Sequence, residues 1–133
     1  MPKRLTEDQI NHYRAHGYCY PVPVLSRPEY TDYRNDLERY ETEIGAPLDF
    51  PEKSKPHLLF RWADEVAHHP AVLDAVEDLI GPNILLYHIT LWTKEANAPA
   101  YVLWHQDGAY FFLDPAEQVT AWVDQHGRLP VSQ

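Results

Sequence analysis

The Gly81-Pro82 pair divides this chain into two halves whose apolar residues follow different periods. Before the pair, apolar residues recur at helical spacing between capping signals; after it, short β-branched and aromatic runs alternate with turn-rich segments. Side chains on one face recur about every 3.6 residues in a helix and every 2 in a strand. The change of period therefore predicts an α+β fold, helical over residues 1–82 and strand-rich over 83–123.

Two capping boxes open the first two predicted helices, and a glycine that can adopt a left-handed conformation ends each of them. These signals are Thr6 with Gln9 and Gly17, and Ser26 with Glu29 and Gly45. Residues 18–24 between them read as an extended connector interrupted by proline. A further helical pattern over 64–80 contains Pro70, which predicts a break into two helices.

The second half predicts four short strands separated by the turn-rich segments 95–99 and 113–117. The strands are expected at 84–88, 90–93, 102–105 and 119–123. With 133 residues, the chain is expected to form one domain.

Composition narrows the classes of partner. The net charge is −9, the pI is about 5.2 and no basic run follows Lys3-Arg4, which argues against nucleic acid and anionic membrane and favours small molecules. A single cysteine, Cys19, excludes an internal disulfide and suits a reducing compartment. No apolar run reaches the roughly 18 residues of a membrane span, and the polar start is no signal peptide. The expected location is cytoplasmic.

His105 and Asp107 are the leading candidates for metal ligands. Residues i and i+2 of a strand project from one face, so the imidazole and the carboxylate can converge on one ion while Gln106 points away. Non-haem Fe(II) oxygenases use two histidines and one carboxylate in this way. The alternative is a hydrogen-bonded His-Asp pair at a strand end.

The context of this pair resembles the phytanoyl-CoA dioxygenase family of Fe(II)/2-oxoglutarate oxygenases. The motifs are Trp104-His105-Gln106-Asp107 with Tyr110-Phe111, the strand Val119-Thr120-Ala121-Trp122, and upstream Gly81-Pro82-Asn83-Ile84 and Lys55-Pro56-His57-Leu58-Leu59-Phe60. They occur in the order that the family shows, and the resemblance covers Leu5 to Val123. It implies N-terminal helices packed on a double-stranded β-helix, a cupin-like jelly roll. Four strands make about half of that barrel, so an incomplete barrel with open sheet edges is expected, and such edges favour self-association.

The resemblance also implies roles for three further residues. Lys55 matches a lysine placed against the cosubstrate 2-oxoglutarate, with a solvated lysine as the alternative. Thr90 falls where the family contacts the cosubstrate from a strand, although threonine is common in strands. Trp122 matches a tryptophan that lines the cosubstrate pocket, with a core aromatic as the compatible alternative. The carboxylate of Asp107 favours hydroxylation over halogenation.

Two parts of the family's site are not seen in this chain: the second iron histidine and an arginine that pairs with 2-oxoglutarate. Both follow the Thr-Ala-Trp strand in the family, whereas residues 124–133 here read DQHGRLPVSQ and do not match. His126 lies only a turn beyond Trp122, whereas the family's ligand returns on a distant strand, so it is the less favoured candidate for the second histidine. His68-His69 reads as a surface feature or a cap, and the remaining histidines have no paired ligand at useful spacing: His12, His16, His57 and His88.

Two functions of different classes remain open. The first is an Fe(II)/2-oxoglutarate-dependent hydroxylase of a small organic substrate, with the third ligand supplied by a partner chain, by His126 or by residues beyond this sequence. The second is a truncated, inactive fragment that acts at most as a metal- or partner-binding module. A cupin-like metal binder would use the same two ligands and water.

Overall fold

The computed structural model describes residues 1–93, 97, 99, 101–103, 105, 107–114, 117–124 and 127–132, the last five of these by their backbone alone. In chain order its elements are α1 (Glu7–His16), β1 (Tyr18–Pro23), α2 (Arg27–Ile44), the 3-10 turn η1 (Pro56–Leu58), α3 (Arg61–Ala67), α4 (Pro70–Ile80), α5 (Gly108–Phe111), β2 (Thr120–Ala121) and β3 (Arg128–Ser132). The coarse prediction of a mixed helix-and-strand protein is confirmed.

Local capping fixes the helices where the sequence places them. Thr6 and Gln9 exchange hydrogen bonds at the start of α1, which ends at Gly17 with φ 78°. At the start of α2 the N–H and hydroxyl of Ser26 both donate to the Glu29 carboxylate, and Gly45 ends the helix with φ 72°. The break at Pro70 is confirmed as well, because α3 ends at Ala67 and α4 begins at Pro70.

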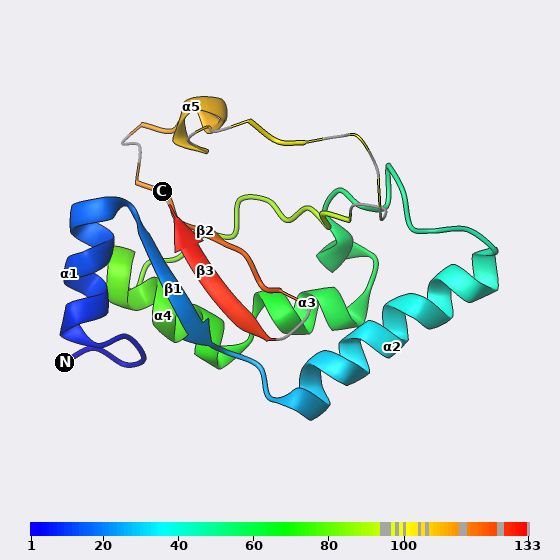
Figure 1. Cartoon of the computed structure of the whole chain (residues 1–133), viewed down its shortest axis with the longest axis horizontal. Coiled ribbons are helices and arrows are strands. Elements are labelled where there is room, and N and C mark those ends of the chain that lie inside the picture. The colour runs from blue at the N-terminus through cyan, green and yellow to red at the C-terminus, as the bar shows by residue number, and fades with distance from the viewer. Residues whose placement is uncertain are drawn as a thin grey trace.

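A small antiparallel sheet of order β1-β3-β2 lies beside α1 and α4 (Figure 1). Its middle strand is β3, from the segment that matches no family pattern, and Cys19 of β1 pairs with Val131 while Val22 pairs with Leu129. The register shifts between these two pairs, so an extra residue of β1 lies opposite Pro130. Because proline has no N–H to donate, this irregular position is where a strand tolerates it.

The core lies between α1, β1 and α4. Side chains of α1 and α4 cover the inner face of β1, and Ala75 of α4 is fully buried. The cluster comprises Leu5, Ile10, Tyr13, Cys19, Val22, Val24, Leu25, Val72 and Ala75. By contrast α2 has no buried residue and extends away from the sheet (Figure 1).

The strand predictions hold less well than the helix predictions. The connector over 18–24 is the strand β1. Among the described residues of 83–123, the structure contains the two-residue strand β2 and an isolated bridge at Thr90, so the predicted strands at 84–88 and 102–105 are wrong for those residues. Side chains there lie open to solvent: Leu85 is 86%, Tyr87 55% and Leu103 72% exposed. Without a second layer to bury them, apolar residues that favour strands gain nothing from pairing.

In the part of the chain that the structure describes, we find no helix that combines the length and the apolar character needed to cross a membrane.

Candidate functional site

His105 and Asp107 lie side by side at the turn that begins α5. Nε2 of His105 is 3.1 Å from Oδ1 of Asp107. Asp107 has helical backbone angles, φ −59° and ψ −37°, and its carboxylate caps no N–H of α5. The two side chains therefore converge as predicted, although the strand expected to bring them together is a helical turn instead.

The second nitrogen of His105 fixes the chemistry of this pair. Nδ1 lies 2.8 Å from the carbonyl oxygen of Leu103, and a carbonyl only accepts hydrogen bonds, so Nδ1 carries a proton. Nε2 of the neutral ring then has a lone pair, and it faces a carboxylate oxygen that also has only lone pairs. Two atoms that both carry lone pairs attract one another only through a shared proton or through a metal cation between them.

The separation of the two atoms suits a metal as well as a proton. Ligands about 2.1 Å from one ion at right-angle positions are about 3 Å apart, which is close to the observed 3.1 Å. The side chains are 32% and 16% exposed, so an ion can reach them. The Tyr110 ring stands edge-on to the imidazole, with centroids 5.8 Å apart.

Lys55 and Thr90 are brought together from distant parts of the chain. Ser54 and Thr90 form an antiparallel bridge. On either side of that bridge, the N–H of Lys55 donates to the carbonyl of Ile89 over 2.8 Å, and the N–H of Leu91 donates to the carbonyl of Lys53 over 2.9 Å. The backbone of Lys55 is left-handed, with φ 57°. The structure thus places two of the three predicted cosubstrate residues in one short ladder.

Trp122, the third of them, lies next to the same ladder. Its ring centroid is 6.4 Å from that of Trp92, two residues beyond Thr90. Trp122 is 41% exposed, so it is not the core aromatic of the alternative interpretation. The sequence analysis did not include Trp92. Its position two residues after Thr90, which puts both side chains on the same face of a strand, could have revealed it.

The candidate residues form two groups within the described part of the chain. Tyr87 packs edge-on against Phe111, with centroids 5.1 Å apart, which ties α5 to the segment that carries Thr90. No hydrogen bond or ion pair joins the His105–Asp107 pair to Lys55, Thr90 or Trp122 among the described residues, and no group of three or more potential metal ligands occurs there. His126 lies outside the described residues.

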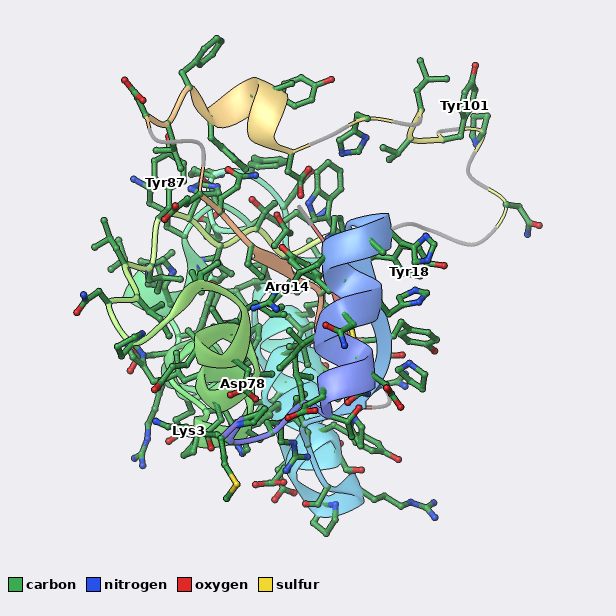
Figure 2. The ribbon with its side chains drawn as sticks, turned by 90° about the vertical axis from the view of Figure 1, so that its left-hand side faces the viewer. Lys3, Arg14, Tyr18, Asp78, Tyr87 and Tyr101 are labelled. Carbon is green, nitrogen blue, oxygen red and sulfur yellow. The ribbon has the colours of Figure 1, made fainter. Side chains whose placement is uncertain are left out.

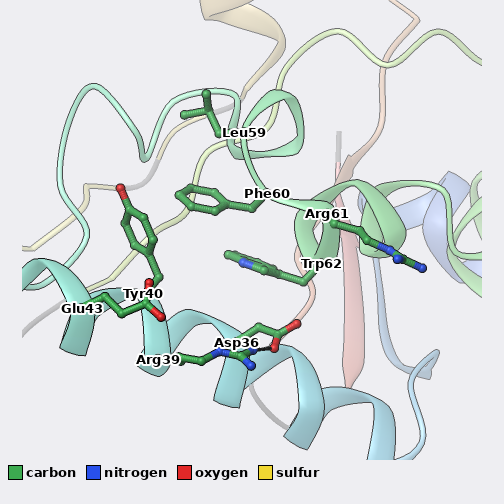
Figure 3. Close-up of a pocket in the computed structure, with 8 residues that line it drawn as sticks. All are labelled: Asp36, Arg39, Tyr40, Glu43, Leu59, Phe60, Arg61 and Trp62. Atoms are coloured by element: carbon green, nitrogen blue, oxygen red, sulfur yellow. Dashed lines mark hydrogen bonds and ion pairs between the residues drawn. The ribbon is translucent and has the colours of Figure 1, made fainter.

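A pocket of about 270 Å³ lies elsewhere, between α2 and the start of α3 (Figure 3). It is lined by Asp36, Arg39, Tyr40, Glu43, Leu59, Phe60, Arg61 and Trp62. The Tyr40 and Phe60 rings meet edge-on at 4.8 Å, and none of the five predicted site residues reaches this pocket.

Among the other described histidines, one caps a helix and two lie ring to ring. His69 precedes α4 and its Nδ1 accepts from the N–H of Ala71 over 3.3 Å, which confirms the prediction of a cap. His12 and His16, for which no paired ligand at useful spacing was expected, lie together on α1 with ring centroids 4.4 Å apart. Their i, i+4 spacing on a predicted helix is the signal that reveals the pair.

The turn that begins α5 presents an imidazole and a carboxylate to one point, which are two of the three ligands that a mononuclear non-haem oxygenase uses. The chain belongs to the phytanoyl-CoA dioxygenase family: the model of that family, phytanoyl-CoA dioxygenase (PhyH), matches residues 13–124. This match confirms the resemblance and places the chain in a family of dioxygenases, which are oxidoreductases. No curated protein and no solved structure matches it.

Proposed function

We propose that this chain carries the function of an Fe(II)/2-oxoglutarate-dependent hydroxylase acting on a small organic substrate. His105 and Asp107 are the proposed iron ligands, and Lys55, Thr90 and Trp122 the proposed contacts of 2-oxoglutarate. The family supports both assignments. Residues 1–133 form one domain in this proposal, with helices on a partial cupin-like barrel, open edges available for self-association, and a cytoplasmic location.

The observation that carries the proposal is the meeting of two acceptors. Because Nδ1 of His105 faces the carbonyl oxygen of Leu103, Nε2 and the Asp107 oxygen converge on a point that can hold a metal cation. An iron ion bound there supplies, with 2-oxoglutarate and oxygen, the oxidising power to hydroxylate an unactivated carbon. The protein contributes the orientation of the two ligands, and the backbone of Lys55 lies beside the Thr90 segment, from which its ammonium group is proposed to bind the far carboxylate of 2-oxoglutarate.

The third ligand is a second histidine from a partner chain, from His126 or from residues beyond this sequence. The competing function is a metal- or partner-binding module without catalysis. One observation favours this module: the described residues bring two potential ligands together and no third.

An anaerobic titration with Fe(II) and then 2-oxoglutarate tests the proposal. We expect the visible charge-transfer band of iron-chelated 2-oxoglutarate, followed by succinate when oxygen is admitted. Asp107→Asn is the sharpest variant, because asparagine keeps a hydrogen bond to His105 but loses the negative charge that a cation needs. His105→Ala should behave alike, and His68→Ala is the matched control on an exposed helix end.

Three results discriminate the functions. Unchanged Fe(II) binding in both Asp107→Asn and His105→Ala would show that the pair is only a hydrogen bond. Fe(II) binding without the band or succinate would favour the binding module. A band with succinate would support the hydroxylase and show that the third ligand is supplied.

A further inference from the structure

We propose that His12 and His16 form a two-histidine clamp on α1 that binds a divalent ion of tetragonal geometry, Cu(II) or Ni(II). Residues four apart on a helix lie one above the other on the same face. Here the two rings approach with centroids 4.4 Å apart and planes 40° from parallel. This site shares no residue with the proposed iron site.

The ring separation fits one coordination geometry better than another. With metal–nitrogen bonds of about 2.1 Å and about 1.1 Å from nitrogen to ring centre, each centroid lies about 3.2 Å from the ion. Two rings at right-angle positions then have centroids about 4.5 Å apart, whereas tetrahedral positions separate them by about 5.2 Å. The observed 4.4 Å is closer to the right-angle case, which is the geometry that Cu(II) and Ni(II) favour.

The rings are free to bind through nitrogen. Among the described residues, neither imidazole makes a hydrogen bond or ion pair, and both side chains are exposed. The Tyr18 ring stands edge-on to His12 with centroids 5.0 Å apart, so it packs beside the clamp. Water fills the remaining coordination positions.

The local field also favours a cation. His16 is in the last turn of α1, and Gly17 ends the helix by donating its N–H to the carbonyl of Tyr13. The carbonyls of a last turn carry partial negative charge, which stabilises a nearby cation. Arg14, the nearest positive side chain in the sequence, lies on the other side of α1 from Tyr18 (Figure 2), as its position two residues from each histidine requires.

A metal at this place would hold together the last two turns of α1. Tyr13 and Cys19 on either side of the corner are buried in the core, while His12, His16 and Tyr18 cover its outer face. An ion that binds the folded helix and not the unfolded chain stabilises the fold by mass action. Unfolding of α1 should therefore need a higher temperature in the presence of Cu(II).

Copper(II) electron paramagnetic resonance on untagged protein at about pH 8, where ordinary imidazoles are neutral, tests the clamp. With less than one equivalent of Cu(II), we expect hyperfine coupling from two imidazole nitrogens. His16→Ala should leave one and weaken Cu(II) binding about tenfold or more, because the second ligand no longer binds within the same molecule. The geometry control is Arg14→His combined with His16→Ala, which keeps the number of histidines but places them on opposite faces.

The outcomes separate this site from the proposed iron site. The clamp is supported if Arg14→His/His16→Ala binds Cu(II) as weakly as His16→Ala, while His105→Ala keeps the two-nitrogen signal. It is overturned if the geometry control binds like the wild type, or if His105→Ala removes the signal. Circular dichroism of each variant checks that α1 remains helical, and a variant with Ala15→Lys, which alters the same turn without touching either ring, should bind Cu(II) normally.

Discussion

The backbone N–H of Lys55 donates to the carbonyl oxygen of Ile89 over 2.8 Å, although the two residues belong to opposite halves of the chain. This bond holds Lys55 in a left-handed turn with φ 57° and directs its side chain from a fixed backbone position beside Thr90. A flexible lysine loses entropy on binding a ligand. Because backbone hydrogen bonds on both sides of the Ser54–Thr90 bridge already fix the loop that carries Lys55, the backbone loses less entropy when the side chain binds a ligand.

Lys55→Gly removes the ammonium side chain while the left-handed turn is kept. Glycine adopts positive φ without the cost of about 1–2 kcal/mol that other residues meet, so the free energy of unfolding should stay within about 1 kcal/mol of the wild type. Binding of 2-oxoglutarate to the Fe(II)-loaded protein should weaken about tenfold or more, because a charge-assisted hydrogen bond contributes about 1.5–3 kcal/mol. Anaerobic calorimetry measures both the affinity and the stoichiometry.

The matched control is Lys53→Ala. The Lys53 ammonium is 3.6 Å from Asp49 and its side chain is only 16% exposed, so it is engaged elsewhere and its loss should leave 2-oxoglutarate affinity unchanged. Equal affinity in Lys55→Gly and the wild type would remove Lys55 from the site.

The helices could be predicted from the sequence because their signals are local. Thr6 and Gln9, or Ser26 and Glu29, contact each other within a single turn, and the same four residues are visible in the sequence as capping boxes. The sheet could not be predicted, because β3 pairs with β1 across almost the whole chain. The proline at position 130 also argued against a middle strand.

In the candidate site, too, local features could be predicted from the sequence and long-range contacts could not. His105 and Asp107 are two residues apart, so their convergence is a local property that survives the replacement of the expected strand by a helical turn. The ladder between Lys55 and Thr90 depends on long-range backbone pairing that no local pattern encodes. The family resemblance supplied these two residues, and residue chemistry alone did not.

Of Gly45, Gly81 and Gly127, which all have positive φ, Gly127 should tolerate a side chain least. A Cβ there would lie 2.6 Å from the carbonyl oxygen of Leu25, and the carbonyl of Gly127 accepts from the N–H groups of both Val24 and Leu25. Gly127→Ala therefore combines backbone strain with a clash against backbone, and we expect it to lower the free energy of unfolding by about 3 kcal/mol.

Gly45→Ala is the matched control for this change. Gly45 has nearly the same φ, 72° against 71°, but nothing lies within 4 Å of its Cβ position. Only the strain remains, so a loss of about 1 kcal/mol is expected. Urea unfolding followed by circular dichroism measures the difference, and equal losses in the two variants would mean that the junction of Gly127 with Leu25 is not close-packed.

Asp78 anchors the N-terminal segment to α4. Its carboxylate accepts three backbone hydrogen bonds, from the N–H groups of Lys3 at 2.7 Å and of Arg4 and Leu5 at 2.8 Å. Burial raises the pKa of Asp78, but the three backbone donors and the nearby Lys3 outweigh it, and the pKa lies below its ordinary value. Asp78→Ala leaves these donors without an acceptor next to the buried Leu5 and should cost about 1–3 kcal/mol of unfolding free energy.

Glu38→Ala provides the comparison for Asp78, since it removes an exposed carboxylate whose ion pair is with Arg34. An exposed pair contributes about 0.2–1 kcal/mol at most, so the Glu38 variant should unfold at almost the wild-type urea concentration. If both variants lost the same stability, the contacts of the N-terminal segment would contribute nothing beyond a surface charge.

Glu29 should make stability depend on pH on the acid side. The hydroxyl and then the backbone N–H of Ser26 lower the pKa of Glu29 from 4.5 to about 2, with a smaller contribution from His69. Because the pKa is depressed in the folded state, the stabilisation is present above pH 4.5 and is lost as the pH falls from 4.5 to about 2. The side chain is 42% exposed, so solvent screens the effect and only a small share of overall stability is involved.

In Ser26→Ala, carboxyl NMR should show the pKa of Glu29 moving upward toward its ordinary value, and unfolding between pH 2 and 4.5 should depend less on pH. His69→Asn removes the smaller contribution while keeping a side chain that can cap α4, so its upward shift should be the lesser of the two; the reverse order would show that His69, and not Ser26, holds this carboxylate ionised.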